Sequence, residues 1–138
     1  MLEMKGRTGA AVMLITHDLG VIAETAQRVV VMYAGRKVEE ASVQALFAQP
    51  RHPYTRGLMT SIPRLNRAPE ESARPRRLTE IPGVVPSLID TPGGCTFAPR
   101  CAYASEQCRV AYPPEVEAAP GHFVACWNAD TLPEMVRG

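Results

Sequence analysis

A short apolar run near the start of the chain, ended by a sharp change of polarity, is the feature that most constrains the fold. Residues 10–15 read Ala-Ala-Val-Met-Leu-Ile and are followed at once by Thr16, His17 and Asp18. This pattern is typical of a buried strand and predicts one over residues 10–16. In open α/β sheets, ligands bind just beyond the carboxyl ends of strands, which is where His17 falls. The sequence therefore predicts an α/β fold with His17 at a ligand site.

Helix and strand signals alternate through the next stretch of the chain. We expect helices over 19–26, 43–48 and 54–61, and strands over 28–33 and 36–40. Asp18 and Ser42 are suited to cap the first two helices, and Pro53 is suited to the first turn of the third. The dipeptide Ala34-Gly35 forms the turn between the two strands, and the second, more polar strand is expected at a sheet edge.

Composition narrows the class of protein. With 15 basic and 14 acidic residues the net charge is +1, which argues against nucleic acid or a charged membrane surface as a partner. Arg74, Arg76 and Arg77 read as a solvated loop, because a phosphate-binding patch needs a higher charge density. No apolar run reaches the roughly 20 residues of a membrane span, and no signal-peptide core follows Met1. We expect a cytosolic protein, in which four cysteines favour metal binding over disulfides.

Two strings carry a resemblance to a known family. Ile-Thr-His-Asp-Leu-Gly-Val-Ile (15–22) and Arg-Val-Val-Val-Met-Tyr-Ala-Gly-Arg-Lys-Val-Glu-Glu (28–40) resemble, in order and spacing, the end of the ATPase core of ABC transporters. The resemblance implies a P-loop NTPase fold and makes His17 the switch histidine, which contacts the γ-phosphate of ATP–Mg. An imidazole suits that role because it can donate a hydrogen bond to a phosphate oxygen. Taken alone, Thr-His-Asp would be read as a partly buried histidine bonded to a backbone carbonyl.

The remaining parts of an ATPase site are not found in the sequence. No Gly-x-x-x-x-Gly-Lys-Ser/Thr phosphate loop occurs among the 138 residues, and the signature motif and the acidic strand with its catalytic glutamate cannot be located. Neither Glu3 nor Glu24 has a spacing that would replace the missing base. We therefore expect that this chain alone does not hydrolyse ATP. We also expect that Met1 is an internal methionine of a longer subunit, since residues 1–9 read as the tail of a helix.

The second informative string is Arg-His-Pro-Tyr-Thr-Arg-Gly-Leu-Met at 51–59. From the residues alone it is a helix start, with His52 in the turn and Tyr54 in a packing position. It also resembles the segment that opens the C-terminal extension of ATPase subunits serving oligopeptide, dipeptide and nickel importers. Ile-Pro-Gly-Val-Val-Pro-Ser-Leu (81–88) resembles the next landmark of that extension. The resemblance covers about residues 1–128 and is silent on the transported solute.

Four cysteines near the C-terminus form a candidate metal site. They are Cys95, Cys101, Cys108 and Cys126, spaced C-x5-C-x6-C-x17-C. Four thiolates complete either a zinc site or an iron–sulfur cluster, and the spacing alone favours neither. The string resembles the cysteine-rich tail of dipeptide-importer ATPases, some of which hold a [4Fe–4S] cluster, and this resemblance favours iron–sulfur. His122 could replace one thiolate or pack beside the site. A structural metal is expected because residues 95–127 hold few apolar side chains.

Together these features predict three stretches. Residues 1–50 would be the C-terminal end of an ABC ATPase core, 51–94 a His-Pro-Tyr helix with a Pro-rich connector, and 95–138 a loop-rich cysteine module with a tail. The complete subunit would couple ATP hydrolysis to solute import, together with a second ATPase subunit and transmembrane permeases, on the inner face of the cell membrane. The alternative is a freestanding metal-binding module without enzymatic activity, which binds a partner through 10–40. The two differ in solution, because an unpaired strand over 10–16 favours aggregation or pairing.

Overall fold

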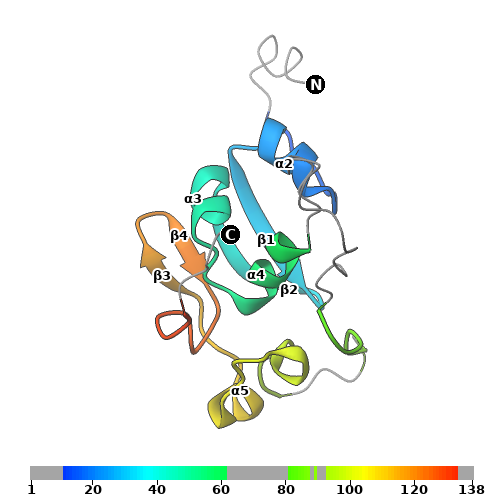
Figure 1. The fold of residues 1–138 in the computed structure, drawn as a ribbon, viewed down its shortest axis with the longest axis vertical. Helices are drawn as coiled ribbons and strands as arrows, with labels where there is room; N and C mark the ends of the chain where they lie inside the picture. The colour runs from blue at the N-terminus through cyan, green and yellow to red at the C-terminus, as the bar shows by residue number, and fades with distance from the viewer. Residues whose placement is uncertain (1–10, 62–80, 88, 90–92, 134–138) are drawn as a thin grey trace, which may run out of the picture.

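The structure, a computed structural model, describes residues 11–61, 81–87, 89 and 93–133. Figure 1 shows its elements, which in chain order are α2 (Leu19–Thr25), β1 (Arg28–Tyr33), β2 (Arg36–Ser42), α3 (Val43–Ala48), α4 (Pro53–Thr60), the 3₁₀ helix η2 (Ala98–Arg100), α5 (Glu106–Val110), β3 (Val116–Ala119) and β4 (His122–Val124). The expected helix tail over 1–9, most of the Pro-rich connector and its three arginines lie outside the described residues.

The four described strands form one antiparallel sheet in the order β1-β2-β4-β3. Ala34 and Gly35 have positive φ angles of 45° and 75° and join β1 to β2 in a two-residue turn, as a type I′ turn requires. The prediction that β2 lies at a sheet edge was wrong. Its second side pairs with β4 at Glu39 and Glu40, because the β3–β4 hairpin returns to the sheet from far along the chain.

The strand predicted over 10–16 is not formed. Residues 11–16 adopt no strand, and the side chains of Met13 and Ile15 are 89% and 92% exposed. A strand needs partners for its backbone N–H and C=O groups, and none of the described strands pairs with this segment. The mixed α/β class is confirmed, but among the described residues the sheet is antiparallel and has no ligand-binding strand end at His17.

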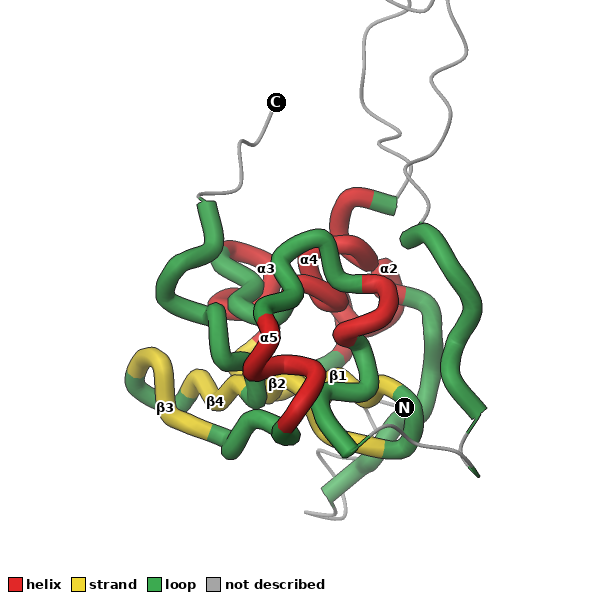
Figure 2. The backbone as a smooth tube through the Cα atoms, turned by 90° about the horizontal axis from the view of Figure 1, so that it is seen from below, coloured by secondary structure: helices red, strands yellow, loops and turns green. Residues whose placement is uncertain are grey.

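The predicted helices and caps are present. Asp18 Oδ1 accepts hydrogen bonds from the amides of Gly20 (2.8 Å) and Val21 (3.2 Å), and Ser42 Oγ accepts one from Ala45 (3.2 Å). The short helix α3 packs on β1 and β2, and Figure 2 shows α3 and α4 on the same face of the sheet. None of the described helices has the length and apolarity that a membrane span requires.

One apolar core joins the β1–β2 hairpin to the loop that carries the cysteines. Along β1, Val29, Val31 and Tyr33 are buried while the alternate side chains face outward. The ring of Phe97, from the cysteine loop, lies 5.1 Å from the ring of Tyr33 and 5.5 Å from that of Tyr54 on α4. This aromatic contact fixes the cysteine loop and the start of α4 against each other.

Candidate functional site

All four predicted metal-ligating cysteines line one pocket, together with His52 and Trp127. The cavity volume of the pocket is about 10 Å³, close to the space that one water molecule needs. The thiols come from separate places in the chain, listed here in order: Cys95 before η2, Cys101 after η2, Cys108 within α5 and Cys126 after β4. All four are free thiols. The structure therefore brings the four predicted ligands to one pocket, and metal binding by them stays a prediction.

Backbone contacts bring the first three cysteines together. The amide of Cys95 donates to the carbonyl of Cys108 at 2.7 Å, which ties the loop before η2 to α5. This approach requires glycine at 94, because a Cβ there would lie 2.4 Å from the Cys108 carbonyl oxygen. The amide of Cys101 closes η2 by donating to Ala98 at 3.2 Å. Cys95 and Cys101 are thus held at the two ends of one tight turn.

Hydrogen-bond donors surround the sulfur atoms. The backbone amides of Phe97 and Ala98 donate to Cys95, and those of Tyr103 and Asn128 donate to Cys101 and Cys126, respectively. The fourth sulfur, of Cys108, lies 3.3 Å from the Ser105 hydroxyl and 3.7 Å from Nδ2 of Asn128. Amide donors of this kind stabilise thiolates and orient them toward a metal.

Burial has the opposite effect on the free thiols. Desolvation raises the pKa of Cys95 and Cys101, and it raises the pKa of Cys126 to about 12, despite the amide hydrogen bonds that favour the thiolates. Without a metal, these three thiols are therefore neutral at pH 7. A bound cation would reverse this preference, because metal ligation deprotonates the thiol.

The metal-free arrangement does not resemble a site for a single ion. Within the part of the chain that the structure describes, no three His, Cys, Asp or Glu side chains form a group that could hold one metal ion. The four thiols line one pocket without forming such a group, and the choice between an iron–sulfur cluster and zinc stays a prediction.

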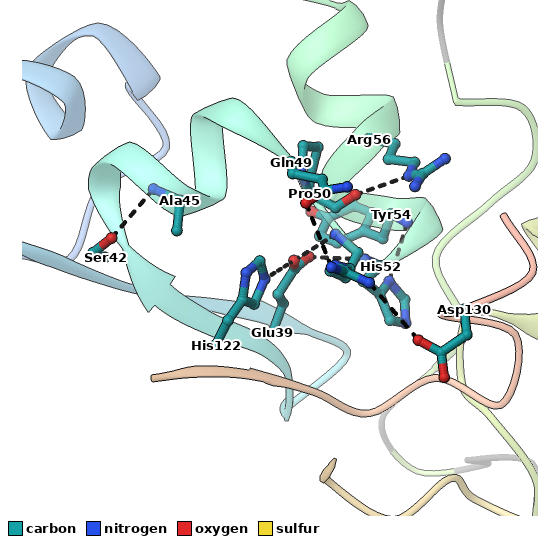
Figure 3. Close-up of polar contacts among 11 residues, drawn as sticks. Glu39, Ser42, Ala45, Gln49, Pro50, His52, Tyr54, Arg56, His122 and Asp130 are labelled. Atoms are coloured by element: carbon teal, nitrogen blue, oxygen red, sulfur yellow. Dashed lines mark hydrogen bonds and ion pairs between the residues drawn. The ribbon is translucent and has the colours of Figure 1, made fainter. Parts of the chain in front are cut away.

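His52 enters the same pocket from the start of α4, where it is 1% exposed. Its backbone amide donates to Glu39 Oε2 at 2.9 Å, and its ring Nδ1 accepts from the amide of Tyr54 at 3.1 Å, as drawn in Figure 3. The ring lies 5.8 Å from that of Phe97. Burial lowers the pKa of His52 to about 4, so the ring is neutral at pH 7. Sequence analysis placed His52 in a turn and did not assign it to the site. The one sequence signal that could have singled it out is its position directly before Pro53, where it caps the helix.

His122 lies away from the thiols. Its Nε2 is 2.7 Å from Oε1 of Glu39, a carboxylate with no exposed surface, and it is not among the residues that line the pocket. Of its predicted roles, that of a packing residue describes it better than that of a ligand. Glu39 also accepts from the amides of Arg51 (2.6 Å) and His52 (2.9 Å). Sequence analysis missed Glu39, because a glutamate next to an apolar strand residue reads as surface.

The other predicted site residue, His17, is exposed at the start of α2. Its neighbours shape a tight turn, since the amide of Asp18 donates to Thr16 Oγ1 at 3.0 Å and Asp18 in turn caps α2. Figure 1 shows α2 and α5 at opposite ends of the molecule, so His17 and the cysteine pocket are separate sites.

A comparison with known families matches residues 38–108, from β2 to the cysteine in α5, to the C-terminal region of oligopeptide/dipeptide transporters. The chain belongs to this family. The matched range contains the His-Pro-Tyr segment, so the resemblance drawn from that segment is confirmed.

Similar proteins are ATP-binding proteins of peptide transporters. A probable peptide ABC transporter ATP-binding protein of Sinorhizobium fredii is 56% identical over 132 residues, which are 96% of this chain and 38% of that protein. A dipeptide transport ATP-binding protein of Bacillus subtilis is 43% identical over the same shares. An oligopeptide transport ATP-binding protein of Mycobacterium tuberculosis is 50% identical over 91% of this chain and 20% of its own length. The chain thus spans about two fifths or less of these relatives.

Proposed function

We propose that this chain is the C-terminal part of the ATP-binding subunit of a peptide ABC importer. The observation that carries the proposal is the 56% identity, over 96% of the chain, to a probable peptide ABC transporter ATP-binding protein. The complete protein would bind ATP–Mg, dock with a second ATPase subunit and with transmembrane permeases, and work on the cytoplasmic face of the membrane. The names of the three relatives above support peptides as the solute, and none of them mentions nickel.

In this proposal the chain contributes one catalytic group, His17, which contacts the γ-phosphate of ATP. Its exposure leaves the ring open to a nucleotide held by another part of the complete protein. The Thr16–Asp18 turn and the cap on α2 hold the backbone on either side of it. An imidazole at this position would donate a hydrogen bond to a phosphate oxygen and stabilise the charge that develops in the transition state.

We also propose that Cys95, Cys101, Cys108 and Cys126 hold a [4Fe–4S] cluster, with zinc as the alternative. The donor set fits the cluster, because four thiols share one pocket and amide or side-chain donors lie at each sulfur. When bound, the cofactor would cross-link the loop around η2, helix α5 and the segment after β4. The stretches 1–50, 51–94 and 95–138 then correspond to the ATPase end, the family-specific connector and the metal-stabilised module.

A chimera tests the transport function. The matched region of the Sinorhizobium fredii relative would be replaced by this chain, and peptide uptake and ATP hydrolysis would be measured in cells that lack the parent subunit. We expect the chimera to restore both. The matched variant His17→Ala should assemble normally and lose about 10²–10³-fold in ATP hydrolysis, the range seen when one transition-state hydrogen-bond donor is removed. A His17→Ala chimera as active as its parent would contradict the role of His17.

A second function, that of a freestanding metal-binding module, has one observation in its favour. The thiol pocket is built from residues that all lie within 52–128, without any contribution from the segment around His17. The chimera separates the two proposals. A chain that binds a cofactor yet cannot replace the relative's own C-terminal region, even when the chimera is folded and bound to its permeases, would favour the module.

A further inference from the structure

The His-Pro-Tyr segment and the cysteine pocket meet at one side chain. His52 is the N-cap of α4 and also lines the pocket formed by the four thiols. Its ring is held on two sides, by the amide of Tyr54 at Nδ1 and by the ring of Phe97, while its backbone amide donates to the Glu39 carboxylate. A side chain fixed so tightly presents its remaining polar atom in one direction.

That remaining atom is Nε2, and it carries the proton. Nδ1 accepts a hydrogen bond from the Tyr54 amide at 3.1 Å, so it has a free lone pair and cannot itself be protonated. The neutral imidazole therefore has its N–H at Nε2. None of the hydrogen bonds found among the described residues uses this N–H. The other polar atoms His52 shares the pocket with are chiefly the four sulfurs.

We propose that His52 is a hydrogen-bond donor of the cysteine pocket, whose Nε2–H donates to a sulfur of the bound cofactor or of its thiolate ligands. The inference rests on the proposed function of the four cysteines, because an effect on the reduction potential requires a bound cluster. His52 would be a positioning residue: it connects α4 of the His-Pro-Tyr segment to the metal and tunes the cofactor electronically. A hydrogen bond to sulfur stabilises the more negative, reduced form of an iron–sulfur cluster, and so raises its reduction potential.

Two substitutions separate the two tasks of this ring. In His52→Asn the side-chain oxygen can take the place of Nδ1 and keep the helix cap, since asparagine is a favoured N-cap residue, but the side chain is too short to reach the pocket. In His52→Gln the amide nitrogen can take the place of Nε2 and keep the donor, while the cap on Tyr54 is lost. If the ring only caps the helix, His52→Gln should disturb the cluster's potential and retention more than His52→Asn does. If the ring donates to the cofactor, His52→Asn should disturb them more.

The test uses the full chain, loaded anaerobically with ferrous iron and sulfide, and followed by visible absorption, electron paramagnetic resonance and redox titration. We expect His52→Asn to load but to show a more negative reduction potential and at least about 10-fold faster loss of the cluster to a chelator. We expect His52→Gln to keep the potential of the unsubstituted chain. Equal potentials for His52→Asn and the unsubstituted chain, with both loaded, would overturn the inference and leave the cofactor proposal standing.

If the unsubstituted chain takes up no cluster, the cofactor proposal fails, and a second measurement still decides the role of His52. In the metal-free chain, ¹⁵N chemical shifts of the ring report which nitrogen is protonated. A proton on Nε2 whose resonance shifts when the four thiols are alkylated supports a donor that faces the sulfurs. A proton on Nδ1, or a resonance indifferent to alkylation, overturns it.

Discussion

His122 and Glu39 are joined by a 2.7 Å hydrogen bond between Nε2 and Oε1, at a place where the carboxylate has no exposed surface. The two residues are 83 positions apart and belong to neighbouring strands, β4 and β2. The same carboxylate accepts from the amides of Arg51 and His52, so it ties the C-terminal hairpin and the start of α4 to the sheet. A buried carboxylate is tolerated only when its oxygens are satisfied in this way.

Replacing this carboxylate by an amide should weaken the whole fold. In Glu39→Gln one oxygen becomes an NH2 group, which faces an N–H donor and leaves it without an acceptor. An unsatisfied buried donor costs about 1–3 kcal/mol, so we expect the free energy of unfolding to fall by that amount in urea titrations. The neighbouring Glu40→Gln is the matched control. Glu40 pairs with Arg28 and Lys37 at the surface, where such pairs contribute about 0–1 kcal/mol. Equal losses in both variants would contradict the role given to Glu39.

The buried ring of His52 predicts a dependence of stability on pH. Its pKa is near 6.5 when exposed, as in the unfolded chain, and about 4 in the folded chain. Between these two pKa values the unfolded chain binds more protons than the folded chain. The contribution of His52 to the free energy of unfolding is therefore fully present above pH 6.5, decreases as the pH drops toward 4, and levels off below that. The difference corresponds to about 3 kcal/mol at most. Urea unfolding of the metal-free chain at several pH values should show this slope.

The variant His52→Asn isolates that contribution from the carboxylates that titrate nearby. Its stability should change less with pH than that of the unsubstituted chain between pH 4 and 6.5, because asparagine carries no titrating group. Parallel curves for the two chains over this range would show that His52 is not the buried neutral ring described above.

Local signals predicted the parts of the fold that depend on neighbouring residues. The Ala34-Gly35 turn specifies the β1–β2 hairpin, and the caps at Asp18 and Ser42 specify where α2 and α3 begin. Long-range partners were not predictable. Nothing near β2 shows that β4 will cover its second side, and the apolar pattern of 10–16 does not reveal that the segment, without a partner, forms no strand.

The candidate site likewise has a part that the sequence predicted and a part that depends on long-range packing. The four cysteines could be grouped from their residue type and spacing, because thiols in one short region have few other roles. The backbone amides at the sulfurs and the ring of His52 could not be found in this way. They reach the pocket through the loop path around η2 and through the burial of α4, which are set by tertiary packing.

Gly94 tests whether the close approach beside Cys95 is needed. A Cβ at this position would lie 2.4 Å from the Cys108 carbonyl oxygen, a backbone atom that can move only with α5. We expect Gly94→Ala to lower stability by about 1–3 kcal/mol, as overpacking does, and to weaken cofactor retention. Gly93→Ala is the control, because no atom lies within 4 Å of a Cβ there. If alanine is tolerated equally at both positions, the Cys95–Cys108 contact is not a fixed part of the site.

Removal of the cofactor should loosen one part of the molecule more than the rest. In the loaded chain the four thiolates would join η2, α5 and the segment after β4, so chelation returns these segments to free thiols that no longer link them. Hydrogen–deuterium exchange should then speed up across 93–133. Strand β1 provides the internal reference, because it lies at the sheet edge away from β4 and pairs with β2, whose residues include no cysteine. Replacing all four cysteines by serine should give the same exchange pattern without any chelator. A uniform change across both regions would mean that the metal stabilises the shared core as a whole, and that the cysteine segment is not a separately stabilised module.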